Sequence, residues 1–358
     1  MQQFFTEDAK DLWQKLKEEK PPVVLYGMNN IAEKVAAKLA ENEVDISGVM
    51  VSDGFLKEKR FLGFPLETLS QIEARLQNFV ILLCFGTDRP EVLARIREIS
   101  RRHPLYAPDL PVTGEGFFDA SYYRSHLEDF RQLSERLADD RSRLVLENTV
   151  KYKLSGDLSY LFRAETAEED CWRLALPCQN LLDLGAYTGD TAALFERLQP
   201  DYTAVYAAEP EERNFRKLSE YAQGKERVRV FHCGIGDKCE TLPFPKGSGR
   251  GSAAKKYLPT EFLSTDEFCE QNRVPRQSLL VKMDLEGWEE KAIRGAANLI
   301  RAHHPNLLIA AYHRRDDLWA IPRQVLALYP DYELYLRHSP CIPAWENNYI
   351  FVNKKTGR

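Results

Sequence analysis

Three short stretches in the second half of the chain place carboxylates where an α/β protein binds its ligands. In LLDLGAYTGDTAALF, a buried strand runs into a glycine turn and the start of a helix. Gly185 and Gly189 let the backbone approach a ligand without a Cβ in the way, and Asp183 adds a carboxylate at the strand end. An acid beside a G-x-x-x-G turn would repel a pyrophosphate, so a dinucleotide is disfavoured. The turn suits the amino group of a zwitterionic, sulfonium-bearing ligand, although such turns also occur as purely structural connections.

The second stretch, YTAVYAAEPEERNFRKL, adds an acid one strand further on. Thr203–Ala208 is predicted to be a strand, and Glu209 at its carboxyl end can accept both hydroxyls of a ribose. The spacing leaves room for one crossover helix, Thr191–Leu198, as a parallel βαβ unit requires. As an alternative, Glu209 only stabilises the start of a helix at Pro210.

The third stretch, LLVKMDLEGWEEKAIRGAANLI, breaks the apolar pattern expected of a central parallel strand. Lys282, Asp284 and Glu286 alternate with apolar residues, which predicts that the three side chains share one side near the strand end. The alternative is a lysine–carboxylate pair that ties the strand to Glu289 or Arg294.

These motifs resemble a known enzyme family. The glycine turn resembles motif I of the class I S-adenosylmethionine-dependent methyltransferases. KMDLEGWEEKAIRGA resembles the signature K-x-D-x-E-G-x-E-x-x-x-L-x-G-A of the FkbM-type methyltransferases, with Ile293 in the leucine position. FHCGIGD, GSGRGSAA, LSTDEF and LLIAAYH also follow in the family's order, and the similarity runs from Lys151 to Asn353.

The resemblance implies the fold, the cofactor and the reaction. The cofactor is S-adenosylmethionine, and the methyl group passes to an oxygen, or less often a nitrogen, of a sugar or natural product. The predicted cofactor-binding residues are Asp183, Gly185, Ala186, Tyr187, Gly189, Asp190, Glu209, Pro210, Gly234 and Asp237. The predicted catalytic residues are His313, Asp284, Lys282 and Glu286.

Methyl transfer is an in-line displacement, so the protein must align its reactants and provide a base if the acceptor is a neutral hydroxyl. His313 follows the next predicted strand, NLLIAAYH, and is expected to titrate near neutrality and to take this proton, while Asp284 orients the acceptor. A lone histidine after a strand is otherwise a surface residue. Asp284 and Glu286 could instead hold a divalent ion, but without a third ligand no metal site is predicted.

Composition narrows the cellular setting. The 358 residues suffice for two domains, and the longest apolar run, FVILLCF, is too short to span a bilayer. The first residues lack the features of a signal peptide, so a cytoplasmic protein is expected. Seven cysteines without a CxxC pair predict reduced thiols, and a net charge of −5 gives no reason to expect nucleic acid or membrane partners. The expected partner is a small-molecule or glycan acceptor, and a homodimer is allowed.

The first part of the chain is predicted to be a small Rossmann-like unit. VVLYGMNNIAEKVAAKLAENEVDISGVMVSD has the pattern of strand, turn, helix and strand. Its dinucleotide fingerprint is degraded to Gly27, Asn29 and Ala32, although Asp53 stands where a ribose-binding acid could lie. We therefore expect a scaffold or acceptor-docking role, with an NAD-linked sugar-modifying enzyme as the alternative.

Between the two units lie a proline- and glycine-rich loop, Ala107–Phe118, and two helical stretches. Tyr122, Tyr123 and Phe130 recur at helical spacing and are predicted to be core residues. Further on, the loop FPKGSGRGSAAKKY is either a lid that brings Arg250 and Lys255 to the acceptor or a solvated hairpin tip.

The predicted fold class is α/β, with a class I methyltransferase sheet preceded by a smaller Rossmann-like domain and a helical connector. The expected boundaries are residues 1–118, 119–165 and 166–358. A rival from another class is a catalytically inactive protein that keeps the methyltransferase fold for interactions.

Overall fold

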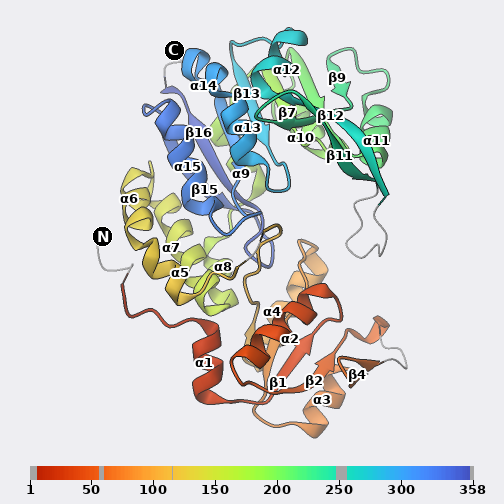
Figure 1. Cartoon of the computed structure of the whole chain (residues 1–358), viewed down its shortest axis with the longest axis vertical. Coiled ribbons are helices and arrows are strands. Elements are labelled where there is room, and N and C mark those ends of the chain that lie inside the picture. The colour runs from red at the N-terminus through yellow and green to blue at the C-terminus, as the bar shows by residue number, and fades with distance from the viewer. Residues whose placement is uncertain (1–5, 56–59, 115, 247–255, 355–358) are drawn as a thin grey trace.

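The computed structural model describes residues 6–55, 60–114, 116–246 and 256–354. Two lobes, each built on its own largely parallel sheet, lie one above the other in Figure 1, with four helices beside them. Within the described residues, no helix is both long and apolar enough to cross a membrane.

The N-terminal lobe follows the predicted alternation of strands and helices. Its six-stranded sheet has the order β3-β4-β2-β1-β5-β6, with β1 parallel to both β2 and β5. Every residue of β1 and of β5 is buried, as expected for central strands covered on both faces. The elements are α1 (Leu12–Glu19), β1 (Val23–Tyr26), α2 (Asn30–Glu41), β2 (Ile46–Met50), β3 (Arg60–Phe61), β4 (Phe64–Glu67), α3 (Leu69–Arg75), β5 (Val80–Leu83), α4 (Pro90–Arg102) and β6 (Leu105–Tyr106).

The connector contains four helices rather than two long ones: α5 (Ala120–Ser125), α6 (Leu127–Arg136), α7 (Asp140–Ser155) and α8 (Leu158–Ala164). Tyr122, Tyr123 and Phe130 are buried, as predicted, and they share one hydrophobic cluster with the large sheet of the second lobe. The Tyr122 hydroxyl donates to Asp316 at 2.6 Å and accepts from Nε1 of Trp319 at 2.8 Å. The connector therefore packs against the second lobe.

The C-terminal lobe has a seven-stranded sheet of order β15-β16-β14-β13-β7-β8-β9, parallel except for β16 between β14 and β15. The chain starts at β7, moves outward through β8 and returns to β13 on the other side. The order reverses between β7 and β13, which is where open α/β sheets bind ligands. Its first elements are α9 (Glu168–Ala175), β7 (Asn180–Leu184), α10 (Asp190–Leu198), β8 (Ala204–Ala208), α11 (Glu212–Ala222) and β9 (Val228–Phe231).

A three-stranded sheet of order β10-β12-β11 is inserted after β9, and α13 packs closely on it. A Cβ on Gly295 would lie 2.1 Å from the carbonyl oxygen of Gly236, which explains the glycine near the end of the signature. Arg250 and Lys255 lie outside the described residues. The remaining elements are β10 (Gly234–Gly236), β11 (Glu240–Lys246), β12 (Lys256–Ser264), α12 (Thr265–Gln271), β13 (Leu279–Met283), α13 (Glu289–Gly295), α14 (Ala297–His303), β14 (Asn306–Ala310), α15 (Asp317–Leu328), β15 (Glu333–His338) and β16 (Asn347–Val352).

The predicted α/β class is confirmed, and so are the strands on either side of the glycine turn. The alternation of Lys282, Asp284 and Glu286 has a different origin from the one expected. Strand β13 ends at Met283, so only Lys282 belongs to it, and both acids lie in the turn before α13. The polar residues mark the strand end rather than one face of a longer strand.

Candidate active site

The glycine turn after β7 needs its glycines for conformation and for space. Gly185 and Gly189 have φ values of +84° and +93°, and Tyr187 between them is also left-handed at +48°. A Cβ on Gly185 would lie 1.9 Å from the carbonyl oxygen of Asp284. The turn after β7 therefore touches the turn after β13, which only a glycine at position 185 permits.

Glu209, directly after β8, holds this glycine turn. Its carboxylate accepts hydrogen bonds from the backbone N–H groups of Tyr187 and Glu211, both at 2.9 Å. Burial raises the pKa of Glu209 to about 7, although the two N–H donors act in the opposite direction. Because each carboxylate oxygen has a second lone pair, Glu209 can still accept hydroxyl groups from a ligand.

Asp183 is fully buried, and neither of its carboxylate oxygens has a hydrogen-bond partner within the described residues. Nζ of Lys282 lies 3.6 Å from one of them, an ion pair too long for a hydrogen bond. Burial raises the pKa of Asp183 to about 6, against the pull of the lysine. A buried carboxylate of this kind calls for a donor or a positive charge.

Lys282 links the two turns. Its Nζ donates to the carbonyl oxygen of Gly185 at 3.2 Å and lies 3.7 Å from Oδ2 of Asp284. Burial alone would lower the pKa of Lys282, but Asp183 and Asp284 raise it above its ordinary value. The predicted lysine–carboxylate pair thus exists, but not with Glu289 or Arg294 as the partner of Lys282.

The other predicted cofactor residues fall into two groups. Ala186 is buried in the glycine turn, Asp190 is the first residue of α10, and the carbonyl oxygen of Pro210 accepts from His232 at 3.2 Å. Gly234 packs in the small sheet, where a Cβ would lie 2.3 Å from the Phe262 ring, and Asp237 forms an ion pair with Arg294 at 3.4 Å. These contacts give the second pair packing roles, and their part in cofactor binding stays a prediction.

The turn after β13 is organised by Glu289, the first residue of α13, which is almost fully buried. Its Oε1 accepts hydrogen bonds from the backbone N–H groups of Leu285 at 2.7 Å and Gly287 at 3.4 Å. Glu286 between them is left-handed, with φ of +51°, and its side chain projects toward solvent. Such strained backbone is found where a site fixes its geometry.

His313 lies three residues after β14, buried among carboxylates. Its Nδ1 is 2.9 Å from Oε1 of Glu289, within ion-pair distance but not aligned as a hydrogen bond. Its Nε2 is 3.4 Å from Oδ1 of Asp284 and 3.8 Å from Oε2 of Glu286. Burial alone would lower the pKa of His313, but these carboxylates raise it to about 9. The expectation that His313 titrates near neutrality is therefore wrong, and at pH 7 it carries a proton.

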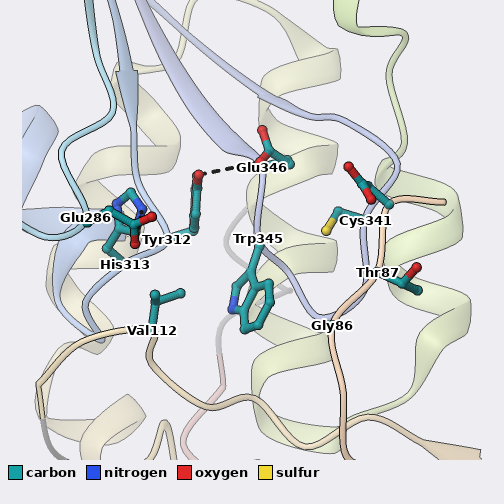
Figure 2. A pocket seen from close by; sticks show the side chains of 10 residues that line it. Gly86, Thr87, Val112, Glu286, Tyr312, His313, Cys341, Trp345 and Glu346 are labelled. Atoms are coloured by element: carbon teal, nitrogen blue, oxygen red, sulfur yellow. Dashed lines mark hydrogen bonds and ion pairs between the residues drawn. The ribbon is translucent and has the colours of Figure 1, made fainter. Parts of the chain in front are cut away.

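A pocket of about 280 Å³ opens beside His313, between the two lobes (Figure 2). The Tyr312 hydroxyl lies 3.4 Å from Oε1 of Glu346 and 3.4 Å from both carboxylate oxygens of Asp284. Burial raises the pKa of Glu346 to about 7. The pocket is lined by Gly86, Thr87, Asp88, Val112, Glu286, Tyr312, His313, Cys341, Trp345 and Glu346.

The N-terminal lobe supplies one wall of this pocket through the loop after β5. Thr87 and Ile342 exchange backbone hydrogen bonds of 2.7 and 3.0 Å, which join the lobes at the pocket rim. Gly86 faces the ring of Trp345 so closely that a Cβ would lie 2.1 Å from it. The wall is therefore a packed contact between the lobes.

In the N-terminal lobe, the side chain of Asn29 occupies the helix N-terminus at which a dinucleotide phosphate would bind. Oδ1 of Asn29 accepts from the backbone N–H groups of Ile31 at 3.0 Å and Ala32 at 3.2 Å, capping α2. Asp53 lies 3.7 Å from Arg95 in an exposed ion pair. Because the first N–H groups of α2 already have an acceptor, a phosphate would have to displace Asn29.

Sequence reasoning missed several residues of the pocket and of the turn after β13. Glu289 stands in the signature itself, so its position was available as a signal. Tyr312 directly precedes His313, but an aromatic residue there carries no pattern of its own. Trp345 and Glu346 come from the loop between β15 and β16, which has no motif, and only the fold brings them to the pocket.

Residues 183–341 match the family model described as the methyltransferase FkbM domain. These residues include the glycine turn, Glu209, the signature and His313. No curated protein sequence matches the chain.

Among solved structures, the chain is similar to the methyltransferase FkbM from Methylobacillus flagellatus KT, with a TM-score of 0.72 and 20% identity. The similarity covers 95% of this chain and 92% of that one, so both lobes share their fold with it. A precorrin-6y C5,15-methyltransferase from Geobacter metallireducens GS-15 gives a TM-score of 0.33 at 11% identity, over 51% of this chain and 82% of that one.

Proposed function

We propose that this chain transfers a methyl group from S-adenosylmethionine to a hydroxyl, or less often an amine, of a sugar or natural-product acceptor, because residues 183–341 match the model of the methyltransferase FkbM domain. The observation that carries the proposal is the contact of two turns at the point where the strand order reverses. The acidic glycine turn lies on one side of this contact, and the carboxylate-lined pocket lies on the other.

The residues of the glycine turn fit S-adenosylmethionine. Its sulfonium and ammonium groups carry positive charge, and Asp183 offers two buried carboxylate oxygens that accept no hydrogen bond from the part of the chain that the structure describes. Glu209 keeps lone pairs for the ribose hydroxyls while it holds the turn. The left-handed turn leaves the Tyr187 ring more than half exposed, available to cover a bound ligand.

The acceptor is proposed to bind in the pocket between the lobes. Gly185 permits the turn after β7 to touch Asp284, whose carboxylate lies within 3.4 Å of both Tyr312 and His313 of the pocket. A ligand in the glycine turn and a ligand in the pocket would therefore meet near Asp284. The carboxyl groups of Asp88, Glu286 and Glu346 favour a neutral or cationic acceptor over a phosphorylated one.

When bound, S-adenosylmethionine supplies a methyl group already activated by its positive sulfur, so the chain's own residues have to orient the acceptor and manage one proton. Asp284, which contacts the pocket residues Tyr312 and His313, is assigned to the acceptor hydroxyl as its proton acceptor. His313, protonated at neutral pH, fixes this carboxylate from one side, and Lys282 fixes it from the other. Glu286 and Tyr312 complete the acceptor side.

Calorimetric titration with S-adenosylmethionine and its demethylated product tests the cofactor half. We expect saturable binding that Asp183→Asn weakens, because an amide loses the charge that attracts the ammonium group. Asp201→Asn is the matched control. This exposed acid precedes the amino end of β8, whereas the glycine turn follows the carboxyl end of β7. Absence of binding to the unaltered protein contradicts the proposal.

The acceptor half is tested by measuring release of the demethylated cofactor with a panel of neutral, amino and anionic sugars. Asp284→Asn should lower kcat by about 10²–10⁴ and leave cofactor affinity nearly unchanged, because it removes the proton acceptor but not the glycine turn. Glu290→Gln, on α13 beside Arg294, serves as the control. If the unaltered protein binds cofactor but methylates nothing, the inactive interaction protein becomes the better reading.

A further inference from the structure

The acids around His313 form a group that the methyl-transfer chemistry alone does not require. One ligand atom each from Asp284, Glu289 and His313 lies within 4.8 Å of the others. In the sequence, Asp284 and Glu286 lack a third ligand, and for that reason no metal site is predicted there. The fold supplies this third ligand by bringing the segment after β14 against the turn after β13.

The distances around the His313 ring fit metal binding at Nε2 and orientation of the ring by a carboxylate at Nδ1. Two atoms that each lie about 2.1 Å from one ion, at tetrahedral or octahedral angles, are roughly 3.0–3.5 Å apart. Nε2 of His313 and Oδ1 of Asp284 are 3.4 Å apart, and Oε2 of Glu286 lies 3.8 Å from the same nitrogen. Nδ1, on the other side of the ring, faces Glu289 at 2.9 Å. A carboxylate at the second nitrogen is the usual device that orients a metal-binding histidine.

Two buried carboxylate oxygens without partners in the described part of the chain are a second observation that points to a cation near His313. Oε2 of Glu289 and Oδ1 of Asp317 accept no hydrogen bond from any described residue, and both side chains are about 99% buried. Asp317 uses its other oxygen to accept from the backbone N–H of Arg314 at 2.7 Å. Glu289 pairs with Nδ1 of His313, and Asp317 also interacts with this histidine, so both buried carboxyl groups with an unpartnered oxygen lie around the ring that would bind the ion.

We propose that Asp284 and Nε2 of His313 bind one divalent cation, which displaces the Nε2 proton, with Glu286 facing it from the exposed side and Glu289 paired with the proton that stays on Nδ1. A donor set of carboxylates and one imidazole suits Mn²⁺ or a related hard to borderline cation. The ion would face the pocket beside Tyr312, where it can bind acceptor oxygens. The binding of acceptor oxygens rests on the proposed function. In that case the acceptor hydroxyl would bind to the ion that Asp284 holds.

The test is a titration of the full-length protein with Mn²⁺, followed by the loss of the electron paramagnetic resonance signal of the free ion. We expect one ion bound per chain, and loss of this binding in Asp284→Asn and His313→Gln. Glu289→Gln should weaken binding by about 10–100-fold, as outer-sphere partners of metal ligands do. Glu290→Gln should bind like the unaltered protein, because this acid lies on the same helix but pairs with Arg294.

Circular dichroism and thermal unfolding of each variant show whether it is folded. If the buried variants fail this check, Glu286→Gln decides, because a side chain that is 78% exposed can be changed without disturbing the core. Weaker Mn²⁺ binding in Glu286→Gln supports the site. Absence of saturable binding to the unaltered protein, or equal binding in the folded variants, overturns it. Calorimetry with S-adenosylmethionine, run without Mn²⁺, tests the cofactor half separately, so each proposal can fail alone.

Discussion

The turn after β7 and the turn after β13 are built alike, but they leave different groups available to a ligand. Each contains a non-glycine residue in the left-handed region, Tyr187 in the first and Glu286 in the second. Each is held by a buried glutamate that accepts backbone hydrogen bonds, Glu209 for the first and Glu289 for the second. Both sites therefore rest on a carboxylate that fixes a strained turn.

The two glutamates differ in which of their carboxylate oxygens accept hydrogen bonds from the backbone. Glu209 uses both oxygens on backbone N–H groups, so its turn is fixed, and each oxygen keeps one lone pair for a further donor. Glu289 uses one oxygen on the turn, while its other oxygen has no partner among the described residues. The first turn suits a hydroxyl-bearing ligand, and the second suits a positive charge.

The largest effect is expected from Gly185→Ala, because it breaks the contact between the two turns. The new Cβ would meet the carbonyl oxygen of Asp284 at 1.9 Å, in a residue with φ of +84°. Gly224→Ala is the control, with φ of +79° and no atom within 4 Å. The left-handed conformation should cost each variant about 1–2 kcal/mol of unfolding free energy, and the clash should cost Gly185→Ala about 1–3 kcal/mol more. Equal stabilities in urea unfolding would mean that the turns can separate freely.

Glu209→Ala should weaken the binding of S-adenosylmethionine by about 1–3 kcal/mol, because the ribose hydroxyls and two backbone N–H groups lose an acceptor. Calorimetry measures the change. Glu220→Ala, an exposed acid of α11, should bind like the unaltered protein. A Glu209→Ala variant with undiminished affinity would leave Glu209 with the alternative role of a helix-terminal acid.

Gly86→Ala should affect the pocket and spare the glycine turn. Its Cβ would lie 2.1 Å from the ring of Trp345, so the tryptophan has to move, at a cost of about 1–3 kcal/mol in stability. We expect cofactor affinity to stay the same while the KM for the acceptor changes. Gly54→Ala, with no atom within 4 Å, is the control in the same lobe. A parallel loss of cofactor affinity would show that the two halves are coupled.

The affinity for S-adenosylmethionine should rise with pH between 5 and 7. Burial raises the pKa of Asp183 to about 6 and that of Glu209 to about 7, so both are largely neutral at pH 5. Ionisation of Asp183 alone should increase the affinity about tenfold over this range, since only the carboxylate attracts an ammonium group. In the ligand-free protein, the same raised pKa values make stability fall as pH rises from about 4 to about 7. Calorimetry at several pH values, with Asp183→Asn as the reference, measures this dependence. An affinity of the unaltered protein that does not change between pH 5 and 7 would contradict the prediction.

The smallest effect is expected from nicotinamide cofactors, which should not bind at all. The side chain of Asn29 already caps the first N–H groups of α2, where a pyrophosphate would bind. Titration of the full-length protein with NAD and NADP checks this. Saturable binding that Asp53→Asn weakens would revive the NAD-linked alternative for the N-terminal lobe.

The sequence alone determined the local elements of the proposed cofactor site. A strand, its turn and the following helix are local, so Asp183, Gly185 and Glu209 could be placed from the hydrophobic pattern and the spacing of glycines. The same local logic predicted β1, α2 and β2 of the N-terminal lobe, and the structure confirms them. It erred where β13 ends, because polar residues after a strand imitate the alternation of a half-buried strand.

Only the tertiary structure decided the acceptor half. His313, Glu289 and Trp345 come from segments far apart in the chain, and Gly86 comes from the other lobe. The raised pKa of His313 has the same origin. It depends on how many carboxylates approach the ring and on how deeply the ring is buried, and both follow from long-range packing that a local sequence pattern does not encode.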